Sequence, residues 1–174
     1  MSRLRVGIGF DAHAFTDGRP LVLAGIEIPW ERGLAGHSDA DLVSHAVTDA
    51  LLGAAGGADI GELYPSDDAA LAGASSIELL GAAWRGLADG GWAIVNVDAV
   101  VIMQEPRLSP HRDAMRARLA EALGVEVERV TVRASTTDML GFTGRGEGAA
   151  CQAVALLQRP VQDELVPQPA KDTS

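Results

Sequence analysis

Two short stretches of the chain contain residue types that bind metal ions. Asp11 and His13 lie two residues apart, directly after the β-rich run 4–10, and side chains with this spacing point the same way in an extended strand. His45 lies further along, in a segment of helical composition. One carboxylate and two imidazoles leave a fourth tetrahedral position open, as in catalytic zinc sites. The pattern therefore predicts a metal centre whose open position takes a substrate oxygen.

The same residues allow a simpler interpretation. Asp39 and Asp41 stand where acidic side chains stabilise a helix N-terminus, and His45 is then an ordinary hydrogen-bonded core histidine. An isolated D-x-H pair is also weak evidence. The metal hypothesis is favoured because three of the four histidines cluster near these two stretches.

A second region with possible chemistry is the segment 134–148, ASTTDMLGFTGRGEG. Its hydroxyls, glycines and Arg145 could offer donors to phosphate groups, although a plain turn between strands explains it equally well. It lacks the G-K-[ST] ending of a Walker loop. Gly7, Gly9 and Ala12 match G-x-G-x-x-A, but the following DAHAFTDGRP cannot form the helix that a dinucleotide fingerprint requires. Both nucleotide-binding classes are therefore disfavoured.

The composition narrows the possible partners. The 174 residues include 24 Asp and Glu against 14 Lys and Arg, so the net charge of -10 disfavours nucleic acid and anionic membranes as partners. The single cysteine, Cys151, lies in an apolar strand pattern and is predicted to be a buried structural thiol. Without a signal-like start or an apolar run of about 20 residues, we expect a cytoplasmic protein.

Several elements must position these groups. The sequence predicts an α+β fold: a two-layer α/β sandwich with a mixed sheet and helices on one face. One domain is expected over residues 1–158, followed by a flexible tail, 159–174. Strands are predicted at 4–10, 21–28, 92–104, 129–135 and 149–158. Helices are predicted from Ser38 to Gly56, from Ser75 or Ser76 to Gly90, and from Ser109-Pro110 to about Leu123. An ordered loop or mobile flap is expected at 58–74.

Four long motifs in order resemble the 2-C-methyl-D-erythritol 2,4-cyclodiphosphate synthase family. They are GIGFDAHAF, GHSDADLVSHAVTDALLGAAGGADIGELYPSDD, VVIMQEPRLSPH and ASTTDMLGFTGRGEGAA. The resemblance implies a phosphorus–oxygen lyase of the non-mevalonate isoprenoid pathway, acting on 4-diphosphocytidyl-2-C-methyl-D-erythritol 2-phosphate and releasing CMP. Such an intramolecular phosphoryl transfer needs no protein nucleophile, because alignment and charge neutralisation accelerate it.

The resemblance also implies roles for individual residues. Asp11, His13 and His45 become zinc ligands, Asp138 holds a second ion such as Mg or Mn between the phosphates, and His37 and Thr136 stabilise the transition state. The implied substrate contacts are Asp11, His13, His37, Ser38, Asp59, Ile60, Gly61, Tyr64, Pro65, Ser66, Asp67 and Asp68; Met103, Gln104, Glu105, Pro106, Arg107, Leu108 and Ser109 around cytosine through backbone groups; and Ala134, Ser135, Thr136, Thr137, Asp138, Phe142 and Arg145.

A homotrimer with active sites between subunits follows from the resemblance alone. Phe10, Phe142, Arg145 and Glu147 then line a central cavity that could take an isoprenoid diphosphate. The chain departs from the family pattern at two positions. Asp138 replaces a longer glutamate, which could weaken or shift the second ion, and Met139 replaces a frequent lysine.

Two other functions compete with this interpretation. A metal-dependent phosphohydrolase would use the same ligands to activate water and would release inorganic phosphate or an open diphosphate. A trimeric module that binds isoprenoid phosphates in its cavity would catalyse nothing. The products formed from the CDP-linked substrate distinguish all three.

Overall fold

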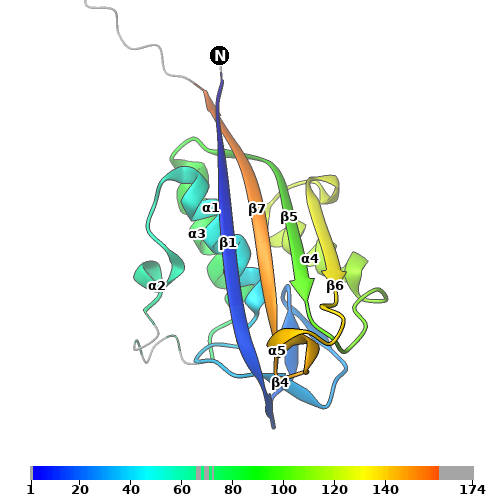
Figure 1. Ribbon diagram of the computed structural model, residues 1–174. Helices are drawn as coiled ribbons and strands as arrows, with labels where there is room; N and C mark the ends of the chain where they lie inside the picture. Colours follow the sequence, from blue (N-terminus) through cyan, green and yellow to red (C-terminus); the bar gives the residue numbers. More distant parts are fainter. Residues whose placement is uncertain (1, 66–67, 69–70, 72, 161–174) are drawn as a thin grey trace, which may run out of the picture.

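The computed structural model describes residues 2–65, 68, 71 and 73–160, and its centre is a mixed sheet of five strands (Figure 1). Only β5 and β6 pair in parallel; the other neighbours are antiparallel. The strands lie in the order β4 (Arg32–Leu34), β1 (Ser2–Asp17), β7 (Gly148–Pro160), β5 (Ala93–Ile102) and β6 (Val130–Ser135).

Helices cover one face of this sheet, which confirms the predicted two-layer fold (Figure 1). Helix α1 packs on β1 and β7, α3 packs on α1 and α4, and α4 also packs on β6. A single hydrophobic core fills the space between sheet and helices. The helices are α1 (Leu42–Ala55), α2 (Ile60–Leu63), α3 (Ser76–Asp89), α4 (Arg112–Leu123), the 3-10 turn η2 (Val127–Arg129) and α5 (Gly141–Gly144).

Glycines in β1 allow α1 to lie unusually close to the sheet. A Cβ atom at Gly7 would lie 2.0 Å from the carbonyl oxygen of Ala50, and one at Gly9 would lie 1.9 Å from that of Ala46. Only glycine permits such an approach of two backbones. The G-x-G pattern near the N-terminus therefore serves helix–strand packing, and it brings the first turn of α1 against the end of β1.

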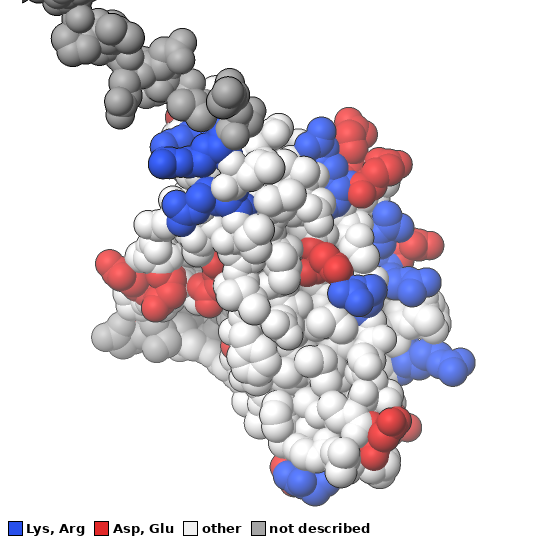
Figure 2. All heavy atoms as spheres, turned by 45° about the horizontal axis from the view of Figure 1, so that its top comes forward, with Lys and Arg blue, Asp and Glu red and all other residues white. Residues whose placement is uncertain are grey.

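The other face of the sheet is open. Along β1, Leu4, Val6, Ile8 and Phe10 point away from the helices and are 59–65% exposed. Figure 2 shows a continuous uncharged area on the molecule, with groups of charged side chains around it. Isolated exposed apolar residues are normal, but a continuous stripe of them marks an interaction surface.

The segment predicted as one strand over 21–28 is a hairpin, and that prediction was wrong. Strands β2 (Leu21–Leu23) and β3 (Ile26–Ile28) form a separate two-stranded sheet. Ala24 and Gly25 make the turn with φ of 53° and 72°. Because the apolar run LVLAGI continues through Ala24 and Gly25, the sequence gives little sign that the strand is interrupted there.

Several boundaries also differ from the prediction. Helix α1 is capped by Asp41 and not by Ser38, and α4 begins at Arg112, not at Ser109-Pro110. The predicted loop 58–74 contains α2. Strand β4 and helix α5 were not predicted, because each has no more than four residues.

Strand β7 continues through Pro160, which pairs with Ser2, two residues into the predicted tail. The rest of that tail lies outside the described residues. Among the helices that are described, none combines the length and the apolar character needed to cross a bilayer.

Candidate metal centre

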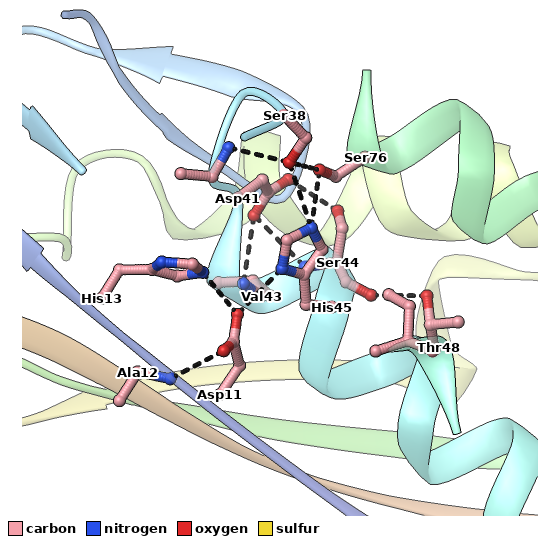
Figure 3. Close-up of polar contacts among 12 residues, drawn as sticks. Asp11, Ala12, His13, Ser38, Asp41, Val43, Ser44, His45, Thr48 and Ser76 are labelled. Atoms are coloured by element: carbon pink, nitrogen blue, oxygen red, sulfur yellow. Dashed lines mark hydrogen bonds and ion pairs between the residues drawn. The ribbon is translucent and has the colours of Figure 1, made fainter. Parts of the chain in front are cut away.

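Asp11, His13 and His45 converge where the first turn of α1 lies against the second half of β1 (Figure 3). Oδ2 of Asp11 lies 2.9 Å from Nε2 of His13 and 2.9 Å from Nδ1 of His45. One ligand atom from each residue lies within 4.8 Å of the other two. The predicted triad therefore exists, and it can hold a metal ion.

The strand and helix fix this geometry in different ways. Asp11 and His13 share the helix-facing side of β1 with Gly7 and Gly9, as the i, i+2 rule requires. His45 lies in the first turn of α1, one residue before Ala46, whose carbonyl meets Gly9. The close helix–strand packing thus sets the distance across which the triad forms.

Electrostatics around Asp11 favour its ionised form. Burial alone would raise the pKa of this carboxyl, but close polar contact with the His13 and His45 rings holds that pKa below its usual range. Contact with Asp11 in turn raises the pKa of His13 against the opposing effect of burial. Each group stabilises the other's charged form when no cation lies between them.

One ring nitrogen suits a metal better than it suits its protein neighbours. Nε2 of His13 is buried, and it has no hydrogen-bond partner of proper geometry within the described residues, despite its 2.9 Å approach to Asp11. Buried polar atoms without a partner are rare. A cation among the three ligand atoms would satisfy this nitrogen, so the donor set fits a metal such as zinc.

Of the two predicted residues before α1, Ser38 lies beside the triad and His37 contacts the predicted flap. Ser38 Oγ lies 3.4 Å from Nε2 of His45. The exposed ring of His37 contacts the carbonyl of Asp68 through Nε2 at 3.2 Å, which ties it to the predicted flap. The flap is also held by the Tyr64 hydroxyl, which donates to the Leu79 carbonyl at 3.1 Å.

The first part of the flap is anchored to α1. Asp59 caps α2 by accepting from the Glu62 N–H, and the Ile60 N–H donates to the Asp49 carboxylate at 2.8 Å. Gly61 lies within α2, and Pro65 ends this described stretch. Of the predicted flap contacts, Ser66 and Asp67 lie outside the described residues.

The predicted phosphate-binding residues lie elsewhere on the sheet. The registers align Ala12, Ala150, Ile102 and Ser135 in one row across four strands. The triad and the loop after β6 therefore lie at the same level along the strands, toward one end of the sheet. They are separated by three strand spacings, or roughly 14 Å at about 4.8 Å each.

That loop has an unusual backbone. Asp138 and Met139 have φ of 50° and 68°, a region in which aspartate is better tolerated than most side chains. Thr136 Oγ1 donates to Asp138 Oδ1 at 3.4 Å, and the Thr137 hydroxyl lies 2.9 Å from that of Thr143. Thr136 and Asp138 are both exposed, and within one chain they lie on the far side of the sheet's width from the triad.

The predicted cytosine-binding turn, Met103 to Ser109, borders a pocket next to the loop. Met103 and Leu108 are only 3% and 4% exposed, so they anchor the turn in the core. Leu108 and Ser109 line the pocket together with Arg112, Met115, Val132, Arg133 and Ala134.

The cysteine prediction can be checked directly. Cys151 is fully buried in β7, and burial raises the pKa of its thiol well above the usual range. A thiol in this state is a poor nucleophile. Its description as a structural side chain is thus supported.

Sequence reasoning missed Ser76 and undervalued Asp39. Ser76 Oγ lies 2.9 Å from Nε2 of His45 (Figure 3). The same hydroxyl donates to the Asp39 carboxylate. Ser76 is 31 residues from His45, and its only signal was a serine at a helix start. Nothing in the periodicity links that helix end to the triad.

Comparison with known proteins identifies the family. A model of the YgbB family matches residues 4–158. The chain belongs to the YgbB family. Among the curated relatives, one from Rubrobacter xylanophilus is named 2-C-methyl-D-erythritol 2,4-cyclodiphosphate synthase. It is 60% identical over 164 residues, 92% of this chain and 99% of that protein. A relative with the same name from Escherichia coli is 54% identical over 154 residues, 88% of this chain and 97% of that protein.

Solved structures of YgbB-type proteins show the same fold. The bifunctional IspDF of Campylobacter jejuni matches with a TM-score of 0.89 and 42% identity. The match covers 92% of this chain and 43% of that longer protein. IspF of Plasmodium falciparum in a CDP complex matches with a TM-score of 0.79 and 30% identity, covering 90% of this chain and 96% of that one. The family expected from the four motifs is confirmed, and so is the expectation of a lyase of isoprenoid biosynthesis.

Proposed function

We propose that this chain cyclises 4-diphosphocytidyl-2-C-methyl-D-erythritol 2-phosphate to 2-C-methyl-D-erythritol 2,4-cyclodiphosphate and CMP. An oxygen of the 2-phosphate forms a bond to the β-phosphorus, and the bond from that phosphorus to the oxygen shared with the α-phosphate breaks. CMP leaves with that oxygen. The observation that carries the proposal is the convergence of Asp11, His13 and His45 on one point, in a chain whose relatives are named for this product.

Zinc is the ion that we assign to this triad. Two imidazoles and one carboxylate suit zinc and leave a ligand position open. When bound, such an ion polarises a phosphate oxygen and offsets the charge that develops on it. The chain's own contribution is to orient the substrate. We assign this role to the Ser38 hydroxyl, which lies beside His45, and to the exposed His37 ring in the same loop, because both can donate to phosphate oxygens.

A second ion, Mg or Mn, is assigned to Asp138. Its carboxylate is exposed and accepts from Thr136 Oγ1, so both residues can face the same phosphate. Hard cations of this kind prefer carboxylate and phosphate oxygens. Thr136 would donate to charge that develops during transfer, as His37 would from the other side of the substrate.

Two halves of the site must meet for this reaction. Because the triad and the Thr136–Asp138 loop lie roughly 14 Å apart across three strand spacings, we propose that a neighbouring copy of the chain supplies the second half. The open apolar face of β1 supports such an assembly, and the expected state is a homotrimer with active sites between subunits. The flap from Asp59 to Asp68 would then cover the methylerythritol.

Cytosine recognition is assigned to the turn from Met103 to Ser109. Its buried Met103 and Leu108 side chains hold the backbone in place beside a pocket. Backbone groups held in this way can pair with the polar edge of a base without any charged side chain. Ala134, which lines the same pocket, leads into the proposed phosphate-binding loop.

The central cavity of the trimer is a further part of the proposal. Phe10 and Phe142 are 59% and 41% exposed, and the Arg145 guanidinium forms a two-bond pair with the Glu147 carboxylate. Aromatic walls with an arginine at one end suit an isoprenoid diphosphate, since they match both its chain and its charge.

One experiment tests the reaction. The full chain, with its metal content measured, is incubated with the CDP-linked substrate, and the products are analysed by mass spectrometry. Equimolar CMP and cyclic diphosphate are expected. Inorganic phosphate or an open diphosphate would instead identify a phosphohydrolase, and unreacted substrate in the presence of Zn²⁺ and Mg²⁺ would identify a binding module.

A further inference from the structure

The ring of His45 is held from both sides. Its Nδ1 lies 2.9 Å from Asp11, and its Nε2 lies 2.9 Å from Ser76 Oγ on the opposite side of the ring. Ser76 is 1% exposed and donates to Oδ1 of Asp39. Hydrogen bonds therefore connect Asp39, in the loop before α1, to Ser76 at the start of α3, and Ser76 to His45 of the triad.

The donor and the acceptor of each hydrogen bond between Asp39, Ser76 and His45 follow from the chemistry of the three groups. The Asp39 carboxylate can only accept, so the single hydroxyl proton of Ser76 goes to it. The Ser76 oxygen must then accept from His45, which places the proton of the neutral ring on Nε2. Nδ1 is left with its lone pair, and Nδ1 is the atom that faces Asp11.

A neighbouring hydroxyl agrees with this assignment. Ser38 Oγ lies 3.2 Å from Ser76 Oγ and accepts from the Ala40 N–H. The Ser38 proton can therefore go to the second lone pair of the Ser76 oxygen. All the polar groups around Ser76 are then satisfied with His45 in a single tautomer.

We propose that Ser76, oriented by Asp39, is a positioning residue that holds His45 as an Nδ1 metal ligand. This inference rests on the metal site of the proposed function and adds residues to it that do not touch the ion. Partners of this kind fix the tautomer and ring orientation of a ligating histidine, and losing one typically costs 10- to 100-fold in metal affinity or activity.

Asp39 also links the triad to the start of α3. Its second oxygen accepts from the Ser76 N–H at 3.0 Å, and its own N–H donates to the Ala74 carbonyl at 3.2 Å. Ser75 occupies the N-cap position of α3 but makes no capping bond with its side chain. The Asp39 carboxylate thus accepts hydrogen bonds at the start of α3 and orients His45 through Ser76. The residues just after the flap are therefore connected to the metal ligand by hydrogen bonds.

The test measures metal binding rather than turnover. Zn²⁺ affinity of the full chain is obtained by competition with a chromophoric chelator, and the absorption spectrum of Co²⁺ bound to the metal-stripped protein reports the ligand geometry. Ser76→Ala is expected to weaken Zn²⁺ binding by about 10- to 100-fold and to alter the Co²⁺ spectrum. Asp39→Asn, which removes the charge that orients Ser76, should shift both readouts in the same direction.

Ser75→Ala is the matched control, because it removes a hydroxyl one residue away that does not reach the ring. It should bind both ions like the unmodified chain. Equal affinity of Ser76→Ala and the unmodified chain, or an equal loss in Ser75→Ala, would overturn the inference. If Ser76→Ala does not fold, Asp39→Asn decides by the same criterion. An unmodified chain that binds neither ion would instead refute the metal site itself.

Discussion

Oδ2 of Asp11 lies 2.9 Å from Nδ1 of His45, although 34 residues separate the two in the chain. The contact depends on backbone packing a few residues away. Gly9, two residues before Asp11, leaves room for the Ala46 carbonyl, which follows His45. The geometry of the metal centre therefore depends on the packing of α1 against β1, and a substitution that moves α1 should also change metal binding.

Gly9→Ala tests that coupling. The added Cβ would lie 1.9 Å from the Ala46 carbonyl oxygen, so α1 must move away from β1. We expect a loss of about 2 kcal/mol or more in the free energy of unfolding, together with weaker Zn²⁺ binding. Urea denaturation and metal titration measure the two effects.

The matched control for Gly9→Ala lies on α1 itself. A Cβ at Gly53 would meet only the Ile8 carbonyl oxygen, at 3.8 Å, so Gly53→Ala should gain up to about 1 kcal/mol from helix propensity. If Gly9→Ala proves as stable as the unmodified chain, the close approach does not constrain the helix.

His45→Ala should remove the metal and leave the fold intact. The ring is 19% exposed at the edge of the core, so its loss opens no large internal cavity. Because the bound ion offsets charge on the reacting phosphate, we expect turnover to fall at least about 100-fold. Metal analysis, circular dichroism and product formation check the three statements.

His111→Ala serves as the control for His45→Ala. His111 stands before α4 and makes no capping bond with its side chain, so its replacement should change none of the three readouts. Full turnover by a metal-free His45→Ala protein would contradict the assigned role of the ion.

The triad was predictable because its signals are local. Asp11 and His13 obey the strand rule of two residues, and His45 lies in a clear helical segment. The cap of α1 was predicted wrongly because Ser38 and Asp41 are equally good capping residues by type. Asp41 is chosen by long-range contacts: its carboxylate also accepts from the N–H groups of Ala24 and Gly25 in the hairpin turn.

The parts of the site that sequence missed all depend on tertiary structure. Ser76 and Asp39 are 37 residues apart and meet only because α3 packs on α1. After the G-x-G pattern β1 continues as a strand through Asp17, so the helix that a dinucleotide fingerprint requires does not follow it. The packing role of the pattern depends on the position of α1, which the local sequence does not give. Distances across the sheet likewise follow from strand order, which no local pattern encodes.

Ile8→Asp tests the proposed assembly. Ile8 is 62% exposed in the middle of the apolar stripe on β1, so a carboxylate there should leave the protomer folded but oppose burial of this face between copies. We expect light scattering to show a trimer for the unmodified chain and a smaller species for Ile8→Asp, with little remaining cyclisation.

Leu63→Asp is the matched control for assembly. Leu63 is also exposed and apolar, at 45%, but it lies on α2 away from the sheet face. Its variant should keep the mass of the unmodified chain. A trimeric Ile8→Asp protein would show that the subunits meet through another surface.

Asp138→Glu tests the second ion, because the extra methylene restores the reach of the glutamate that the family resemblance leads one to expect. A longer carboxylate should lower the Mg²⁺ concentration needed for half-maximal cyclisation several-fold. Asp138→Asn should raise this Mg²⁺ concentration, because the amide lacks the charge that hard cations require. Asparagine has the size of aspartate and also tolerates the backbone φ of 50° at this position. Zinc content should be the same in both variants, since Asp138 is not one of the three residues, Asp11, His13 and His45, to which we assign the zinc ion. An unchanged Mg²⁺ dependence in Asp138→Asn would place the second ion at other residues.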